Sequence, residues 1–210
     1  MKIKVCGMRE PENIKAVEAL GPDFMGFIFY KKSKRFVGED FDTSVLESLP
    51  KSINRVGVFV KEEVSVILEK VKKYKLDYVQ LHGGESIETC QKVKSAGVKV
   101  IKVLSVSNQL PAANIKSFED SVDLFLFDTE TPEFGGSGQV FDWSILKGYP
   151  SRIPFLLSGG IGLNEVEKIK KLKFPQLLGI DVNSKFEIEP GLKDEALLNK
   201  LFKTFQAKVR

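Results

Sequence analysis

The sequence predicts an α/β fold, a closed (β/α)8 barrel that forms a single domain over residues 1–210. Short apolar runs, rich in β-branched and aromatic residues, occur eight times along the chain. Stretches with the spacing of amphipathic helices alternate with them. The length of 210 residues leaves about 26 residues for each of eight units, which suits one strand, one helix and two short loops. No room remains for a second domain.

The apolar runs are bounded by Gly, Asp or Ser and are expected to be strands buried on both faces. They span residues 3–6, 24–29, 55–60, 78–82, 99–104, 124–128, 155–158 and 178–182. Such strands, each followed by a helix, form a parallel sheet with the helices outside, and eight units can close into a barrel.

Apolar side chains at helical spacing occupy the first, third, fourth and seventh intervals and the segment after the last strand. Val64, Ile67, Leu68 and Val71 are an example from the third interval. The second, fifth and sixth intervals carry weaker helical signals. An open doubly wound sheet is the competing architecture, but Cys6-Gly7-Met8-Arg9-Glu10 lacks the Gly-rich pattern that such sheets often carry after the first strand.

The composition indicates which classes of partner to expect and in which cellular compartment the protein acts. The basic residues are mostly lysines spread singly and the net charge is only +4, so we expect a solvated surface and no nucleic-acid partner. Cys6 and Cys90 cannot form a disulfide framework and show no metal-site spacing, which favours a cytoplasmic protein. Neither a signal peptide nor a run of about eighteen apolar residues is present, so no membrane association is expected.

Polar residues at the strand ends are the candidate site, because barrel enzymes build their active sites at that face. Gly159-Gly160 and Asn183-Ser184 follow the last two strands, where backbone N–H groups and a helix N-terminus can bind a phosphate. The alternative interpretation is a tight turn at the glycines and a helix cap at Asn183-Ser184. Two suitable loops on adjacent strands favour the phosphate site.

Asp128 and Cys6 each allow two interpretations. Asp128 precedes a long Gly-rich loop, residues 129–138, which suggests a lid closing over an acid, but an aspartate also caps loops by accepting backbone N–H bonds. Cys6 ends the first strand, where nearby cations could lower the pKa of its thiol. Cys6 could equally be a buried apolar residue, as we expect for Cys90.

His82 and Arg35 also follow strands. His82 suits either a ligand contact or a hydrogen bond that orders its loop. Arg35 lies in a short basic cluster that is either ordinary surface or a binding site for a carboxylate or an aromatic ring.

Ordered motifs along nearly the whole chain resemble the phosphoribosylanthranilate isomerase family. They are residues 4–8 (KVCGM), 26–29 (GFIF) with 33–35 (SKR), 56–59 (VGVF), 79–83 (VQLHG), 127–129 (FDT), 135–138 (GGSG) with 141–143 (FDW), 157–161 (LSGGI), 179–184 (GIDVNS) and 190–194 (PGLKD). The resemblance implies an enzyme of tryptophan biosynthesis. Its reaction is an Amadori rearrangement of N-(5-phosphoribosyl)anthranilate to 1-(2-carboxyphenylamino)-1-deoxyribulose 5-phosphate.

The resemblance also implies the catalytic roles. Asp128 is expected to be the general acid that protonates the furanose ring oxygen, and Cys6 the general base that removes the C2′ proton. Asp128 must therefore begin protonated and Cys6 must be a thiolate, which requires a lowered pKa for the thiol.

Substrate contacts follow from the same resemblance. The backbone of Gly159, Gly160, Asn183 and Ser184 would bind the phosphate. Arg35 would contact the anthranilate and Asp181 the sugar. The only implied partner is this phosphorylated small molecule, with no metal or organic cofactor, and the chain is expected to be a monomer or a homodimer. Lys185 departs from the small Gly that the family often has there, so it either reaches the phosphate or points into solvent.

Three rival functions are set against this one. The isomerase of histidine biosynthesis performs the same rearrangement, but it uses an Asp where this chain has Cys6 and needs a second phosphate site. Residues 135–138 are the only candidate for that site, and we interpret them as the lid. An indole-forming barrel of the tryptophan pathway is the second rival. A catalytically silent phosphate sensor is the third, and it is disfavoured because Cys6 and Asp128 are both present.

Overall fold

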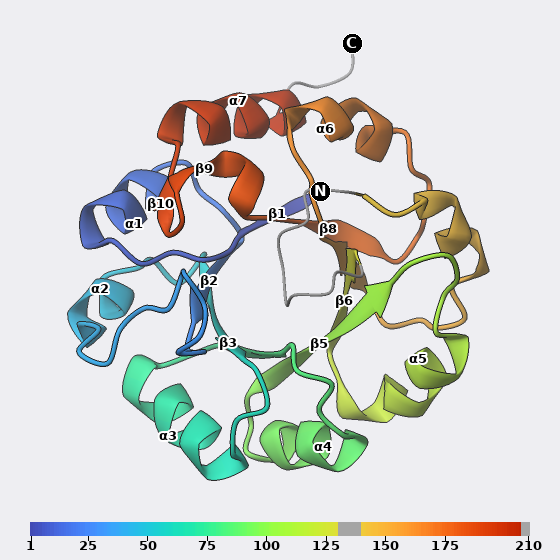
Figure 1. The fold of residues 1–210 in the computed structure, drawn as a ribbon, viewed down its shortest axis with the longest axis horizontal. Coiled ribbons are helices and arrows are strands. Elements are labelled where there is room, and N and C mark those ends of the chain that lie inside the picture. Colours follow the sequence, from blue (N-terminus) through green and yellow to red (C-terminus); the bar gives the residue numbers. More distant parts are fainter. Residues whose placement is uncertain (130–139, 207–210) are drawn as a thin grey trace.

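Parallel strands pair in chain order and close into a barrel, seen from one end in Figure 1. The structure, a computed structural model, describes residues 1–129 and 140–206. The barrel strands are β1 (Lys2–Val5), β2 (Phe24–Ile28), β3 (Asn54–Phe59), β4 (Tyr78–Leu81), β5 (Lys99–Val106), β6 (Leu124–Thr129), β7 (Phe155–Leu157) and β8 (Leu177–Val182). The pairing of β1 with both β2 and β8 completes the ring. The barrel prediction is confirmed, and every predicted strand end lies within two residues of the observed one.

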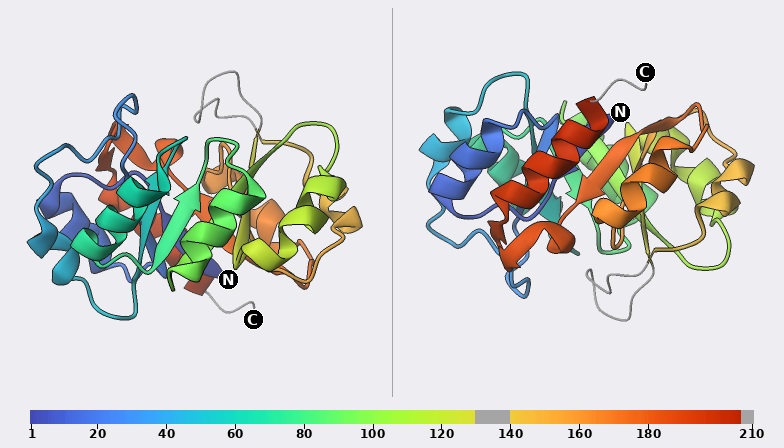
Figure 2. Two further views of the ribbon diagram at one scale, coloured as in Figure 1. Left: turned by 90° about the horizontal axis from the view of Figure 1, so that it is seen from below. Right: turned by 90° about the horizontal axis from the view of Figure 1, so that it is seen from above.

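Helices surround the ring and run beside the strands (Figure 2). They are α1 (Pro11–Glu18), α2 (Thr43–Glu47), α3 (Val64–Tyr74), α4 (Ile87–Ser95), α5 (Ala112–Phe118), α6 (Leu163–Lys170) and α7 (Glu195–Gln206). The five intervals with helical spacing all hold helices. The weaker signals of the second and fifth intervals correspond to the short α2 and α5, and the described part of the sixth holds a 3-10 helix, η2 (Trp143–Gly148). In the described ranges, no helix has the length and apolar character needed to cross a membrane.

Side chains alternate along the strands between two apolar layers. One layer fills the barrel interior, and it contains Phe24, Val56, Tyr78, Ile101, Val103, Leu124, Leu126 and Leu156. The other layer lies between the strands and the helices and includes strand residues such as Ile3, Phe27 and Val79. This two-residue period is the alternation expected for a barrel whose interior is packed with side chains.

Three lysines are exceptions to the solvated basic surface that the composition predicts for most of them. Lys4, Lys102 and Lys193 are at most 2% exposed. Each of these buried ammonium groups is offset by a carboxylate, in the pairs Lys4–Asp181, Lys102–Glu85 and Lys193–Glu187. Burial of a lysine is tolerated when its charge is paired in this way.

A small hairpin follows the last barrel strand, and the sequence analysis did not predict it. After the 3-10 helix η3 (Ser184–Phe186), strand β9 (Glu187–Glu189) pairs antiparallel with β10 (Leu192–Lys193). Figure 1 shows the hairpin inside the helical ring, between α1 and α7. Glu187 and Lys193 are therefore carried to the mouth of the barrel.

Candidate active site

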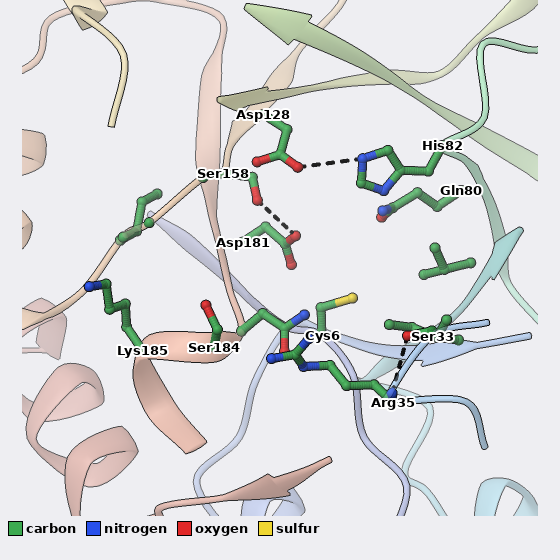
Figure 3. A pocket seen from close by; sticks show the side chains of 16 residues that line it. Cys6, Ser33, Arg35, Gln80, His82, Asp128, Ser158, Asp181, Ser184 and Lys185 are labelled. Carbon is green, nitrogen blue, oxygen red and sulfur yellow. Dashed lines mark hydrogen bonds and ion pairs between the residues drawn. The ribbon is translucent and has the colours of Figure 1, made fainter. Parts of the chain in front are cut away.

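One cavity at the carboxyl ends of the strands gathers all the predicted site residues (Figure 3). Its lining includes Cys6, Arg35, His82, Asp128, Gly159, Gly160, Asp181, Asn183 and Ser184. Ser33, Gln80, Ser158 and Lys185 line it as well. Residues from both ends of the chain meet there because β1 pairs with β8.

The end of the cavity beside β7 and β8 has the backbone geometry of an anion site. Gly159 and Gly160 adopt φ values of +82° and +67°, a region that favours glycine. A Cβ on Gly159 would lie 2.5 Å from the backbone N of Thr129, so no side chain fits. Helix α6 begins three residues after Gly160, and Lys185 lines the same cavity as the two glycines.

Gly7 allows the loops after β1, β2 and β8 to meet. Its φ of +76° favours glycine, and an added Cβ would lie 2.8 Å from both Arg35 Cδ and Asn183 Oδ1. Arg35 and Asn183 therefore pack directly against the backbone that follows Cys6. Any larger residue at position 7 would displace one of them.

Arg35 is held by the hairpin. Its Nε and Nη2 donate to the Glu187 carboxylate, at distances of 2.6–3.0 Å. Lys193 Nζ donates to Glu187 Oε1 and to Asn183 Oδ1, both at 2.7 Å. Although burial opposes ionisation of Glu187, Arg35 and Lys193 hold the pKa of its carboxyl below the usual value. This arrangement fixes the guanidinium at the edge of the cavity.

Cys6 lies in a buried, charged environment. The Lys4 ammonium, two residues before it, donates to Asp181 Oδ1 at 2.8 Å, and Ser158 Oγ donates to Asp181 Oδ2 at 3.2 Å. Lys4 and Lys193 favour the thiolate, but burial outweighs them and raises the pKa of the Cys6 thiol. The expectation that nearby cations lower this pKa is therefore wrong, because Cys6 is only 4% exposed and burial prevails.

Asp128 and His82 lie next to each other on one side of the cavity. His82 Nε2 lies 3.4 Å from Asp128 Oδ2 (Figure 3). Gln80, in β4 two residues before His82, is 2% exposed, and its Oε1 has no hydrogen-bond partner among the described residues. In those ranges no cluster of three or more His, Cys, Asp or Glu side chains could hold a metal ion.

Several residues of this site were missed from the sequence. Lys4 precedes Cys6 by two positions and Gln80 precedes His82 by two, so the strand period already placed them on the inward face. Glu187 and Lys193 gave no such signal, since Glu187 pairs with Arg35 across 152 residues and Lys193 enters the site through Glu187 and Asn183. The lid predicted at residues 135–138 lies outside the described residues.

Comparison with known proteins identifies the chain. Residues 3–204 match the family model described as N-(5'phosphoribosyl)anthranilate (PRA) isomerase. This chain belongs to the PRA isomerase family. A PRA isomerase from Parabacteroides distasonis is 49% identical over 195 residues, which are 92% of this chain and 88% of the relative.

Solved PRA isomerase structures share the fold. The enzyme from Thermotoga maritima superposes with a TM-score of 0.88 at 35% identity, over 98% of each chain. Another structure of it, described as monomers generated from a dimeric isomerase, has a TM-score of 0.83 at 31% identity over 99% of each chain. A PRA isomerase in complex with reduced 1-(o-carboxyphenylamino)-1-deoxyribulose 5-phosphate has a TM-score of 0.84 at 32% identity, over 98% of each chain.

The function is therefore that of the PRA isomerase family, an isomerisation in tryptophan biosynthesis. The comparisons favour it over the isomerase of histidine biosynthesis and the other rivals. They do not assign roles to individual side chains.

Proposed function

We propose that the chain isomerises N-(5'-phosphoribosyl)anthranilate by acid–base catalysis, with Asp128 as the acid and Cys6 as the base. The observation that carries this proposal is that both side chains line one cavity, on opposite sides of it, with Asp181 between them (Figure 3). A sugar lying between them would present its ring oxygen to one group and C2′ to the other.

The reaction then needs two proton transfers. Asp128 gives its proton to the furanose ring oxygen, the bond from that oxygen to C1′ breaks, and the aniline nitrogen forms a Schiff base. The Cys6 thiolate removes the C2′ proton, and the resulting enolamine tautomerises to the aminoketone. His82 Nε2, 3.4 Å from Asp128 Oδ2, is placed to orient the carboxyl group that makes the first transfer.

Substrate contacts are proposed from the charges around the cavity. Gly159, Gly160, Asn183 and Ser184 bind the phosphate through their backbone, and Asp181 accepts hydrogen bonds from sugar hydroxyls. Arg35 binds the anthranilate carboxylate through Nη1, since Nε and Nη2 already donate to Glu187. The product analogue bound to a relative that is 32% identical supports a ligand of this shape.

The proposal also covers the oligomeric state of the protein and its location in the cell. The dimeric relative from Thermotoga maritima supports a homodimer, which light scattering of the purified chain would test. The single barrel domain is expected to act in the cytoplasm, in line with two buried free cysteines and a biosynthetic family.

A direct assay tests the chemistry. Purified protein should consume the substrate without added metal or nucleotide, followed by the loss of anthranilate-type fluorescence. Cys6→Ala and Asp128→Asn should each lower kcat by about 10²- to 10⁴-fold, the usual contribution of a general acid or base. Cys90→Ala is the matched control, because Cys90 lies buried in α4, outside the cavity, and should leave kcat unchanged. Full activity in both site variants would refute the assignment.

A further inference from the structure

Lys4 is a fully buried cation that the two proton transfers do not use. Its side chain is 0% exposed inside the barrel, and its ammonium donates to Asp181 Oδ1 at 2.8 Å. A buried ion pair is weak evidence for stability, because apolar residues of similar volume often serve as well or better. A charge kept at this position therefore points to a role in the site beside it.

The ammonium of Lys4 and the sulfur of Cys6 lie close to the same residue, Gly26. They are two residues apart at β1 and so project from the same side of the strand. A Cβ on Gly26 of the neighbouring β2 would lie 2.8 Å from Cys6 Sγ and 3.2 Å from Lys4 Nζ. The sulfur and the ammonium thus pack against one glycine, whose missing side chain leaves room for both.

We propose that Lys4 is a positioning residue whose ammonium, held by Asp181, stabilises the negative charge that Cys6 carries as the base. This inference rests on the proposed role of Cys6. Ionisation of the thiol releases its proton to solvent, the thiolate then takes the C2′ proton, and Lys4 keeps its own protons throughout. Although burial opposes the ammonium, Asp181 and Cys6 raise the pKa of Lys4, so it stays charged at neutral pH.

Other charges around Cys6 must enter any test. The groups that act on it are Lys4 from β1, Asp181 from β8 and Lys193 from β10, with Arg35 packed on the adjoining Gly7 and no charged side chain from β2. Asp181 has two opposing effects, since it holds Lys4 in place but also repels a thiolate. Its removal should therefore lower the pKa of Cys6 as long as Lys4 remains.

The test is a pH titration of the thiolate by its ultraviolet absorbance. Each protein is compared with the same protein carrying Cys6→Ala, so that Cys90 and the tyrosines cancel, and circular dichroism checks that both stay folded. Asp181→Asn should move the Cys6 midpoint to lower pH, and adding Lys4→Met should move it back up by about one to three pH units. Lys4→Met alone should raise the midpoint above that of the wild type and lower kcat/KM at neutral pH.

Lys102→Met is the matched control, because Lys102 is an equally buried, ion-paired lysine remote from Cys6. It should leave the Cys6 midpoint unchanged even if it costs stability. The proposal is overturned if Lys4→Met does not alter the midpoint in the Asp181→Asn protein, or if Lys102→Met alters it equally. The titration measures the pKa of the thiol and does not depend on turnover, so it tests the role of Lys4 alone. The role of Cys6 as the base is tested separately, because full activity in Cys6→Ala would refute it.

Discussion

Arg35 and Glu187 form a two-point ion pair across 152 residues of sequence, with Arg35 Nη2 2.6 Å from Glu187 Oε2. Their side chains are 18% and 4% exposed. A carboxylate from the hairpin thus determines how the guanidinium presents its remaining N–H groups to the cavity.

Glu187→Gln should weaken substrate binding and destabilise the fold. The variant leaves the buried Lys193 ammonium and the Arg35 guanidinium without their carboxylate, which costs about 3 kcal/mol for a buried pair. We expect KM to rise about tenfold, with a smaller change in kcat. Steady-state kinetics and urea unfolding measure the two effects. Glu39→Gln, which removes the partner of the exposed Lys31, is the control and should change neither. An unchanged KM in Glu187→Gln would show that Arg35 needs no such support.

Removing only Lys102 from the Lys102–Glu85 pair should lower the free energy of unfolding more than removing both charges. Glu85 is 4% and Lys102 2% exposed in this pair, at 2.9 Å. Lys102→Met leaves a buried carboxylate alone and should lower the free energy of unfolding by about 3–5 kcal/mol. The double variant Lys102→Met, Glu85→Gln should recover part of that loss, as denaturant unfolding would measure. A double variant less stable than Lys102→Met would contradict this account.

Acid should weaken the fold through the same carboxylates. Burial opposes ionisation of Glu85, but Lys102 and backbone N–H groups lower the pKa of its carboxyl below the usual value. Because the pKa of Glu85 is lower in the folded protein than in the unfolded chain, its ionised form stabilises the fold above the unfolded pKa of about 4.3. This stabilisation is lost as the pH falls through the pKa of the folded state. Unfolding free energies measured from neutral pH down to acid should therefore decrease less steeply in Glu85→Gln than in the wild type. Parallel curves would argue against a shifted Glu85.

Alkylation of Cys6 in the free enzyme should be slow at neutral pH. Burial raises the pKa of this thiol above its ordinary value, so the thiolate fraction should grow about tenfold per pH unit well beyond neutrality. Inactivation by iodoacetamide should accelerate accordingly and should be slowed by the product. Cys90→Ala should show the same rates, since burial raises the pKa of Cys90 to about 11. A rate that levels off near neutral pH would mean that the cations prevail over burial.

Lys185→Gly should test the departure from the small residue that the family often has. Lys185 lines the cavity beside Gly160 and is exposed, so its ammonium can approach a phosphate without a burial cost. We expect KM to rise about three- to tenfold with kcat nearly unchanged, as befits a contact made equally in the ground and transition states. Lys168→Gly, on the outer helix α6, has no part in the cavity and is the control for lost surface charge. Equal KM values for wild type and Lys185→Gly would assign Lys185 to solvent.

The barrel was predictable because its signals are local. Each strand is a short apolar run and each long helix carries its own spacing, so β1 to β8 and helices such as α3 follow from neighbouring residues alone. The strand-end rule then collected Cys6, His82, Asp128 and Asp181 in one cavity. The state of Cys6 was not predictable, because its pKa depends on burial and on the balance between Lys4 and Asp181 across the barrel. The hairpin partner of Arg35, Glu187, was equally hidden, since β9 and β10 have only three and two residues.

The hairpin that holds Arg35 comes after all eight barrel strands in the chain. A fragment ending at Val182 contains all eight strands of the closed ring, together with Cys6 and Asp128. It lacks Asn183, Glu187 and Lys193, so nothing from β9 or β10 would hold Arg35 in place. A chain that stops before β9 would thus keep every strand of the barrel but lose both the support of Arg35 and the last outer helix, α7, which packs on α1 and α6.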